Sequence, residues 1–147
     1  MKILAVGIAV FILTFASAAY GRMDATISIT SVQYSVRKSG VHVIHHYLLY
    51  NRRRGPTPIG NAVTICQNVG TRNGPFRNVA TYCQGTYSIG HNGSIQVEGV
   101  SRSPVYFQYA VTGGTGQYFG AGGELTVTVY AQKPRRELLK FTYVRSA

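Results

Sequence analysis

The acidic side chains of this chain are the first candidates for chemistry, because Asp and Glu together number only 4 in 147 residues. Asp24 lies at the edge of the first expected strand and Glu137 follows two arginines at a strand start, so we expect both at the surface. The other two acids are Glu124 and Glu98. Glu98 lies inside an alternating polar and apolar run. Turned inward, Glu98 could act as a general acid or base, and it is our acidic candidate for catalysis. Turned outward, which the pattern favours, it would be an ordinary surface group.

Cys66 and Cys83 are the two cysteines of the chain, and a turn-like stretch at 70–75 lies between them. If the strands on either side form one hairpin, the two side chains become cross-strand neighbours. An even pair of cysteines in an exported protein then predicts one disulfide. The alternative is two small buried thiols. In that case the thiol of Cys66 is a second catalytic candidate.

Tyrosine is unusually frequent, with 11 residues spread over most of the apolar runs. Aromatic faces around an enclosed space can hold an apolar or phenolic molecule, and we expect Tyr47, Tyr82 and Tyr106 to contribute to such a ligand site. The alternative is ordinary amphipathic packing, with the hydroxyl groups at the rim.

Three histidines lie close together in the sequence, at His42, His45 and His46. On a strand, His42 and His46 share one face and His45 points the other way. Two histidines could contribute to a zinc site, but no third ligand is evident. We therefore expect no metal site. The glycine-rich stretch lacks the Gly-Lys-Ser/Thr ending of a phosphate loop, so we expect no other cofactor.

Short alternating or apolar runs supply the elements that would position these side chains. The runs are rich in Val, Ile, Thr, Tyr and Phe and are bounded by Gly, Pro, Asn or Ser, which favours strands. We expect eight strands, at residues 26–37, 41–50, 61–68, 79–89, 93–100, 105–112, 124–132 and 137–145. Closure of such a meander removes its exposed edges. The sequence thus predicts one all-β domain over 24–147, an eight-stranded antiparallel β-barrel whose lumen could hold one small ligand.

The first residues have the pattern of a secretory leader. A basic start is followed by an apolar run over 3–15, and then by a small-x-small cleavage pattern at 16–18. This pattern predicts a cleaved signal peptide at 1–18. The apolar run of about 13 residues is short for a membrane span, which needs roughly 20. We expect a secreted, extracellular protein.

The chain is strongly basic, with 15 Lys and Arg residues and a formal net charge of +11. Basic clusters at 52–54 and 133–136 lie beside prolines in expected loops. They are either solvated loop charge or a means of engaging an anionic polysaccharide or lipid surface. Since the leader directs the chain away from most nucleic acid, we expect no nucleic-acid partner.

A glycine-rich stretch carries a specific resemblance to a known family. The segment 110–116, followed by Gly120 and Gly123, resembles the Ala-x-Thr-Gly-Gly-x-Gly-x-x-x-Gly-x-x-Gly corner of allene oxide cyclases. The related dirigent proteins share a Val-Gly-Gly-Thr-Gly corner. Further matches to the cyclase pattern are the segments 60–66, 93–99 and 139–143.

The resemblance implies an eight-stranded barrel that can assemble as a homotrimer and that holds a reactive intermediate in one geometry. The cyclases close an unstable fatty-acid epoxide into a cyclopentenone, the dirigents steer the coupling of phenoxy radicals, and neither needs a metal or a nucleotide. The chain departs from the cyclases in its first strand, since residues 25–36 contain no acid.

Two hypotheses about function follow. The first is a barrel that binds a small apolar or phenolic intermediate in its lumen and steers its cyclisation or coupling. The second is a non-catalytic secreted binding protein whose basic loops engage an anionic surface. The sequence leaves open whether the chain is an enzyme.

Overall fold

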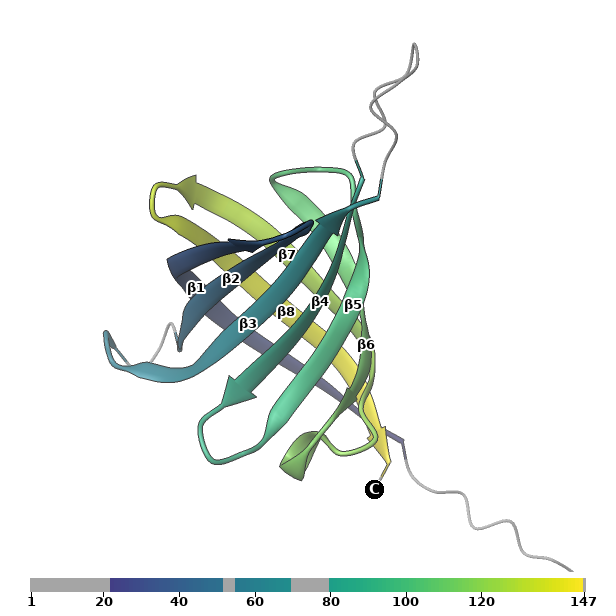
Figure 1. The fold of residues 1–147 in the computed structure, drawn as a ribbon. Coiled ribbons are helices and arrows are strands. Elements are labelled where there is room, and N and C mark those ends of the chain that lie inside the picture. The colour runs from purple at the N-terminus through teal and green to yellow at the C-terminus, as the bar shows by residue number, and fades with distance from the viewer. Residues whose placement is uncertain (1–21, 52–54, 70–79, 147) are drawn as a thin grey trace, which may run out of the picture.

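The computed structural model describes residues 22–51, 55–69 and 80–146, which form a single closed sheet (Figure 1). All eight expected strands are present, and the clearest differences are that β1 and β3 begin earlier than expected. A short 3-10 helix, η1 (Gly116–Tyr118), lies between β6 and β7. The strands are β1 (Arg22–Ser39), β2 (His42–Tyr50), β3 (Pro58–Asn68), β4 (Thr81–Ile89), β5 (Ser94–Ser101), β6 (Tyr106–Gly114), β7 (Gly122–Gln132) and β8 (Arg135–Ser146).

The sheet closes because the last strand pairs with the first. Each strand is antiparallel to its neighbour in the sequence, and the β1–β8 ladder runs from the Arg22–Ser146 pair to the Val32–Arg136 pair. A closed sheet leaves no free edge for another chain to pair with. The expected eight-stranded antiparallel barrel is confirmed, whereas the leader expected at 1–18 lies outside the described residues.

One half of the barrel interior is filled with apolar side chains. This half lies at the end that carries the β4–β5 turn and η1, drawn at the bottom of Figure 1. We call it the closed half, and packing of this kind excludes water from a lumen of eight strands. Its inward side chains include Ile29, Leu49, Ile89, Ile95, Leu125, Leu139 and Phe141, all at most 6% exposed.

The opposite half, which we call the open half, has a different interior. It lies at the end that carries the β5–β6 and β7–β8 connections, at the top of Figure 1. The same alternation of side chains brings aromatic, hydroxyl and charged groups inward here. They include Tyr47, Thr64, Tyr109 and Glu137, which are all buried.

The glycine-rich connection between β6 and β7 seals the closed half. Gly116 adopts φ +60°, and a Cβ atom there would overlap the backbone oxygen of Asn92. The amides of Thr115 and Gln117 donate to the backbone oxygens of Ser94 and Asn92, each at 2.8 Å. Glycine allows the two backbones to approach this closely. The motif that carries the family resemblance is therefore structural, and it lies at the end of the barrel opposite the open half.

Candidate ligand-binding site

A cavity of about 350 Å³ occupies the open half. Its walls come from β2, β3, β4, β5, β6, β8 and the β5–β6 connection. This volume is at the lower end of the range of small-molecule sites, roughly 300–1,000 Å³. Its aromatic lining is Tyr47, Tyr87, Phe107 and Tyr109, and its ionisable lining is His45, Arg102, Arg135 and Glu137.

Two glycines in the wall leave room for the aromatic rings. A Cβ atom on Gly99 would lie 2.8 Å from Cδ1 of Tyr109, and one on Gly85 would lie 3.0 Å from Cε2 of Tyr87. Both distances are too short for ordinary contact, so any larger residue would push the rings aside. The glycines thus allow each tyrosine ring to approach the neighbouring backbone closely.

Glu137 lies inside the cavity and is 3% exposed, so the expectation of a surface position is wrong. The reason is that β8 begins at Arg135, two residues before the expected start. The alternation that buries Leu139 and Phe141 therefore extends back to Glu137 and Arg135. Arg135 and Glu137 occupy alternate positions in line with Leu139 and Phe141. This alternation is the sequence signal that could have identified both residues as pointing inward.

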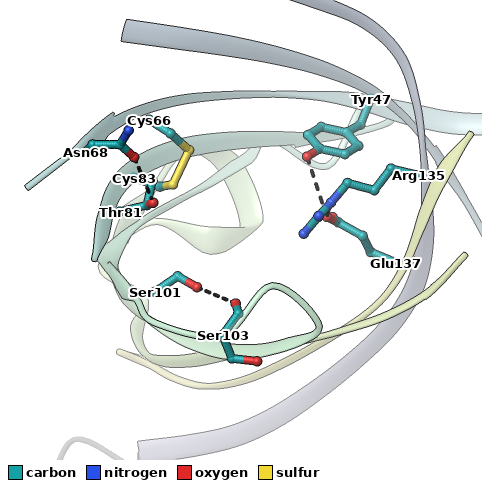
Figure 2. The surroundings of a disulfide bond; sticks show 9 residues. All are labelled: Tyr47, Cys66, Asn68, Thr81, Cys83, Ser101, Ser103, Arg135 and Glu137. Atoms are coloured by element: carbon teal, nitrogen blue, oxygen red, sulfur yellow. Dashed lines mark hydrogen bonds and ion pairs between the residues drawn. A yellow bond between two sulfur atoms is a disulfide. The ribbon is translucent and has the colours of Figure 1, made fainter. Parts of the chain in front are cut away.

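Glu137 is the centre of a hydrogen-bonded cluster (Figure 2). Its Oε1 accepts a hydrogen bond from Nε of Arg135 at 2.6 Å and a longer one from the hydroxyl of Tyr47 at 3.5 Å. Its Oε2 accepts a bond from Oγ of Ser31 at 3.0 Å. The guanidinium of Arg135 also lies 5.9 Å from the centre of the Phe107 ring, within range of a cation–π interaction. A buried carboxylate is tolerated because its charge is paired and both of its oxygens are hydrogen-bonded.

Arg135 keeps its charge in this setting. Burial acts to lower the pKa of Arg135, but the hydrogen bond and the negative charge of Glu137 more than offset it, so the pKa is raised. The cavity therefore always contains a guanidinium cation.

His45 is the second polar group of interest, because its Nδ1 is buried and has no hydrogen-bond partner in the described part of the chain. Its ring is stacked beside that of Tyr47, with the ring centres 6.2 Å apart. Burial lowers the pKa of His45 below 6.5, and the positive charges of Arg135 and His46 lower it further. The imidazole is therefore neutral at pH 7.

The tyrosines of the cavity are protonated at neutral pH. Burial and the charge of Glu137 raise the pKa of Tyr109 to about 12. The same two causes, in the same order, raise the pKa of Tyr47 and of Tyr87. These side chains can therefore act as hydrogen-bond donors.

Cys66 and Cys83 form a disulfide between directly opposite positions of β3 and β4, with their Cα atoms 4.1 Å apart. The predicted disulfide is confirmed, although the turn expected at 70–75 lies outside the described residues. The bond lines the cavity wall (Figure 2). Since its sulfur is bonded, Cys66 has no free thiol to act as a nucleophile.

The remaining sequence candidates divide between the two faces of the sheet. Tyr47 lines the cavity, as expected of a lumen residue. Tyr82 and Tyr106 do not, because they alternate with inward neighbours such as Cys83 and Phe107, and Tyr106 is 51% exposed. Their expected place in the lumen is wrong.

Glu98, which the sequence pattern placed on the outside, is indeed on the outer face. It alternates with the buried Val97, and it accepts a hydrogen bond from the hydroxyl of Tyr82 at 2.9 Å. The carboxylate that enters the lumen is that of Glu137.

Within the described ranges, no three His, Cys, Asp or Glu side chains are grouped in a way that could hold a metal ion. The same part of the chain has no helix of the length and hydrophobicity needed to cross a membrane.

No protein-family model matches the chain, and no curated protein matches it in sequence. Solved structures do match. A pyocyanin demethylase is 26% identical, with a TM-score of 0.62 over 78% of this chain and 98% of its own. A pterocarpan synthase dirigent protein is 12% identical, with a TM-score of 0.61 over 92% of this chain and 98% of its own.

A third match is a nonspecific heme-binding cyclase that catalyses a [4 + 2] cycloaddition in neoabyssomicin biosynthesis. It is 13% identical, with a TM-score of 0.64 over 86% of this chain and 66% of its own. The resemblance drawn from the glycine-rich corner is therefore confirmed at the level of the fold: the chain is a barrel of the dirigent and cyclase-like type.

Proposed function

We propose that the open half of the barrel binds a small aromatic, phenolic or otherwise largely apolar molecule and steers its cyclisation or coupling. The observation that carries this proposal is the cavity itself, in which aromatic walls surround a few polar groups directed into one space. The similar barrels support it, because their names describe action on pyocyanin, pterocarpan synthesis and a cycloaddition.

Confinement is the first contribution of such a site. A cavity of about 350 Å³ restricts a flexible ligand to few conformations, so that one reacting geometry is favoured. For the coupling of radicals, which arrive already oxidised, orientation is all that the barrel supplies.

Proton transfer is the second contribution, and it suits an isomerising cyclisation. Neutral His45, which lines the cavity, accepts a proton from the ligand on its imidazole and later returns it at another ligand atom. The hydroxyl groups of Tyr47 and Tyr109 retain their protons and can donate to an oxygen that gains negative charge. The reaction consumes no oxidant, because each proton that is removed is returned.

A lumen-filling variant tests the proposal. Pyocyanin, unsaturated fatty acids and phenylpropanoids are each mixed with the protein, and retained ligand is measured by native mass spectrometry. We expect retention of at least one class, and loss of that retention in Thr64→Phe, whose ring would enter the cavity. Thr128→Phe makes the same change on the outer face of β7 and should retain the ligand. Retention of none of the three classes, or retention unchanged by Thr64→Phe, contradicts the proposal.

We further propose that residues 1–18 are removed during export and that the mature protein is extracellular. The disulfide supports this, because such bonds persist in oxidising compartments. The intact mass of protein recovered from the medium of expressing cells should lack these residues. Full-length protein retained inside the cells would contradict it.

The second candidate function is non-catalytic binding to an anionic polysaccharide or lipid surface. The observation in its favour is a group of exposed cations around the open half, Arg37, Lys38, Lys133 and Arg136. Retention on pectin-like and heparin-like resins should then fall as salt rises. Retention that does not respond to salt would exclude this candidate.

A homotrimer is also part of the proposal. The outer wall exposes apolar side chains on β3, β5 and β6, among them Ile65, Val100 and Tyr106. Light scattering coupled to size-exclusion chromatography should give three times the chain mass, and a monomer mass would reject the trimer.

A further inference from the structure

The charged side chains of the described residues are unevenly distributed along the barrel axis. Asp24 and Glu124 lie near the first residues of β1 and β7, at the closed half, and Glu98 lies on the outer wall. Glu137 is the one acid of the described ranges that lies in the open half. The cations of that half are Arg37, Lys38, Arg102, Lys133, Arg135 and Arg136.

Two of these cations, Arg102 and Arg135, line the cavity and can donate further hydrogen bonds to a ligand. Arg102 is exposed at the mouth, in the connection between β5 and β6. Arg135 uses Nε to bind Glu137, and its two terminal nitrogens make no hydrogen bond within the described residues. Figure 2 shows this guanidinium directed toward the interior of the barrel. A free edge of a guanidinium matches the two oxygens of a carboxylate or a similar oxyanion.

The acid in the cavity does not cancel this positive character. The charge of Glu137 is matched by Arg135, and both of its oxygens already accept hydrogen bonds from Arg135, Tyr47 and Ser31. His45 is neutral at pH 7 because burial lowers its pKa. The charge that remains unmatched in the lining is the positive charge of Arg102.

We propose that the ligand of this barrel is an anion, with an aromatic or apolar body in the lumen and an oxyanion group at the mouth between Arg102 and Arg135. The inference rests on the proposed lumen-binding function and adds the chemical class of the ligand to it. A carboxylate, a sulfonate or a phosphate ester would satisfy the same donors. The ring of exposed cations around the mouth also raises the local concentration of such anions and speeds their entry.

Two fluorescent probes that share one ring system test the inference. Anilinonaphthalene sulfonate carries a sulfonate, and phenylnaphthylamine has the same aromatic rings without it. We expect both to bind, to compete with each other and to be excluded by Thr64→Phe. The anionic probe should bind about fivefold tighter, which is the upper end of what one exposed charge pair gives. Added salt should weaken the anionic probe and leave the neutral one unchanged.

Variants at the mouth identify the groups responsible. Arg102→Gln should weaken the anionic probe about fivefold and leave the neutral probe unchanged, and Arg102→Glu should weaken the anionic probe further. Arg102 is exposed, so neither change threatens the fold. Lys140→Gln removes the same charge from the outer face of β8 and should change neither affinity.

The outcomes separate this inference from the function on which it rests. Equal affinity for the two probes, or an equal loss of anion affinity in Arg102→Gln and Lys140→Gln, overturns the anion inference while lumen binding stands. Failure of both probes to bind overturns the lumen-binding function as well.

Discussion

The two halves of this barrel use the same strands for different purposes. At the closed half, inward positions hold Leu, Ile and Phe side chains that are almost completely buried. At the open half, the inward positions of the same strands hold Tyr, Thr, His, Arg and Glu around a cavity of about 350 Å³. Strand β8 shows the change most clearly, because Phe141 and Leu139 lie in the apolar half and Glu137 and Arg135 in the polar one.

The contrast assigns stability to one half and chemistry to the other. A filled apolar lumen stabilises the barrel, since each buried side chain is removed from water and closely packed. A cavity with a buried ion pair contributes less to stability and depends on the rest of the structure to hold it. Substitutions in the two halves should therefore differ in both stability and binding.

The largest effect should come from the closed half. Leu125→Ala should cost about 3 kcal/mol or more of unfolding free energy, because Leu125 is fully buried and its loss leaves a void. Phe107→Ala in the open half should cost less, since the ring borders an existing cavity. Urea denaturation measures the loss of unfolding free energy in both variants. Equal losses would contradict the distinction between the halves.

The disulfide should have the next largest effect. The double change Cys66→Ala and Cys83→Ala opens a link between positions 17 residues apart, which should lower the unfolding free energy by about 3 kcal/mol. Thermal denaturation of the double variant beside the unchanged protein would show it. Titration of the unchanged native protein should find no reactive thiol, and two reactive thiols would disprove the bond.

Glu137→Gln should lower the stability of the protein and raise its affinity for an anion. It removes the charge that pairs with Arg135, which should cost about 1.5–3 kcal/mol of stability, as expected for hydrogen bonds to a charged group. It also leaves the charge of Arg135 unmatched, so the affinity for anilinonaphthalene sulfonate should rise while that for phenylnaphthylamine does not. An unchanged or lower anion affinity would contradict a role for Arg135 in binding the anion.

The smallest effect concerns His45 and pH. Because the pKa of His45 is lowered in the folded protein, the unfolded chain binds a proton first as pH falls below 6.5. Stability contributed by neutral His45 is therefore present above 6.5 and is lost as pH falls through the window between 6.5 and the lowered value. His45→Gln should flatten this loss, whereas His42→Gln, at an exposed position, should not. Identical pH profiles for the His45 variant and the unchanged protein would contradict the burial of this imidazole.

The fold could be predicted from the sequence because its signals are local. Alternation of apolar and polar residues marked the eight strands, and the glycines of the β6–β7 corner indicated a close approach of two backbones. The disulfide followed from the same signals, since a hairpin register that opposes Cys66 and Cys83 needs only the two strands.

The site was harder to predict because it depends on which face of each strand points inward and on which end of the lumen is filled. Tyr82 and Tyr106 were assigned to the lumen by residue type, although each alternates with neighbours that are the inward ones. Glu137 is expected at the surface because two arginines precede it. Leu139 and Phe141, however, occupy alternate positions of the same strand and point to the same, inward face. The filling of one end depends partly on Tyr118, which is 3% exposed and packs against Tyr143 at a ring separation of 5.9 Å. No local pattern shows such a contact.

The central claim is that a ligand occupies the lumen of the open half. Backbone amide chemical shifts, recorded by NMR during titration with anilinonaphthalene sulfonate, test it most directly. We expect the large changes at His45, Tyr47, Phe107 and Arg135, with Ile95 and Leu125 nearly unchanged. Shifts that instead follow the outer wall around Ile65 and Tyr106, or that are spread evenly over both halves, would contradict the account.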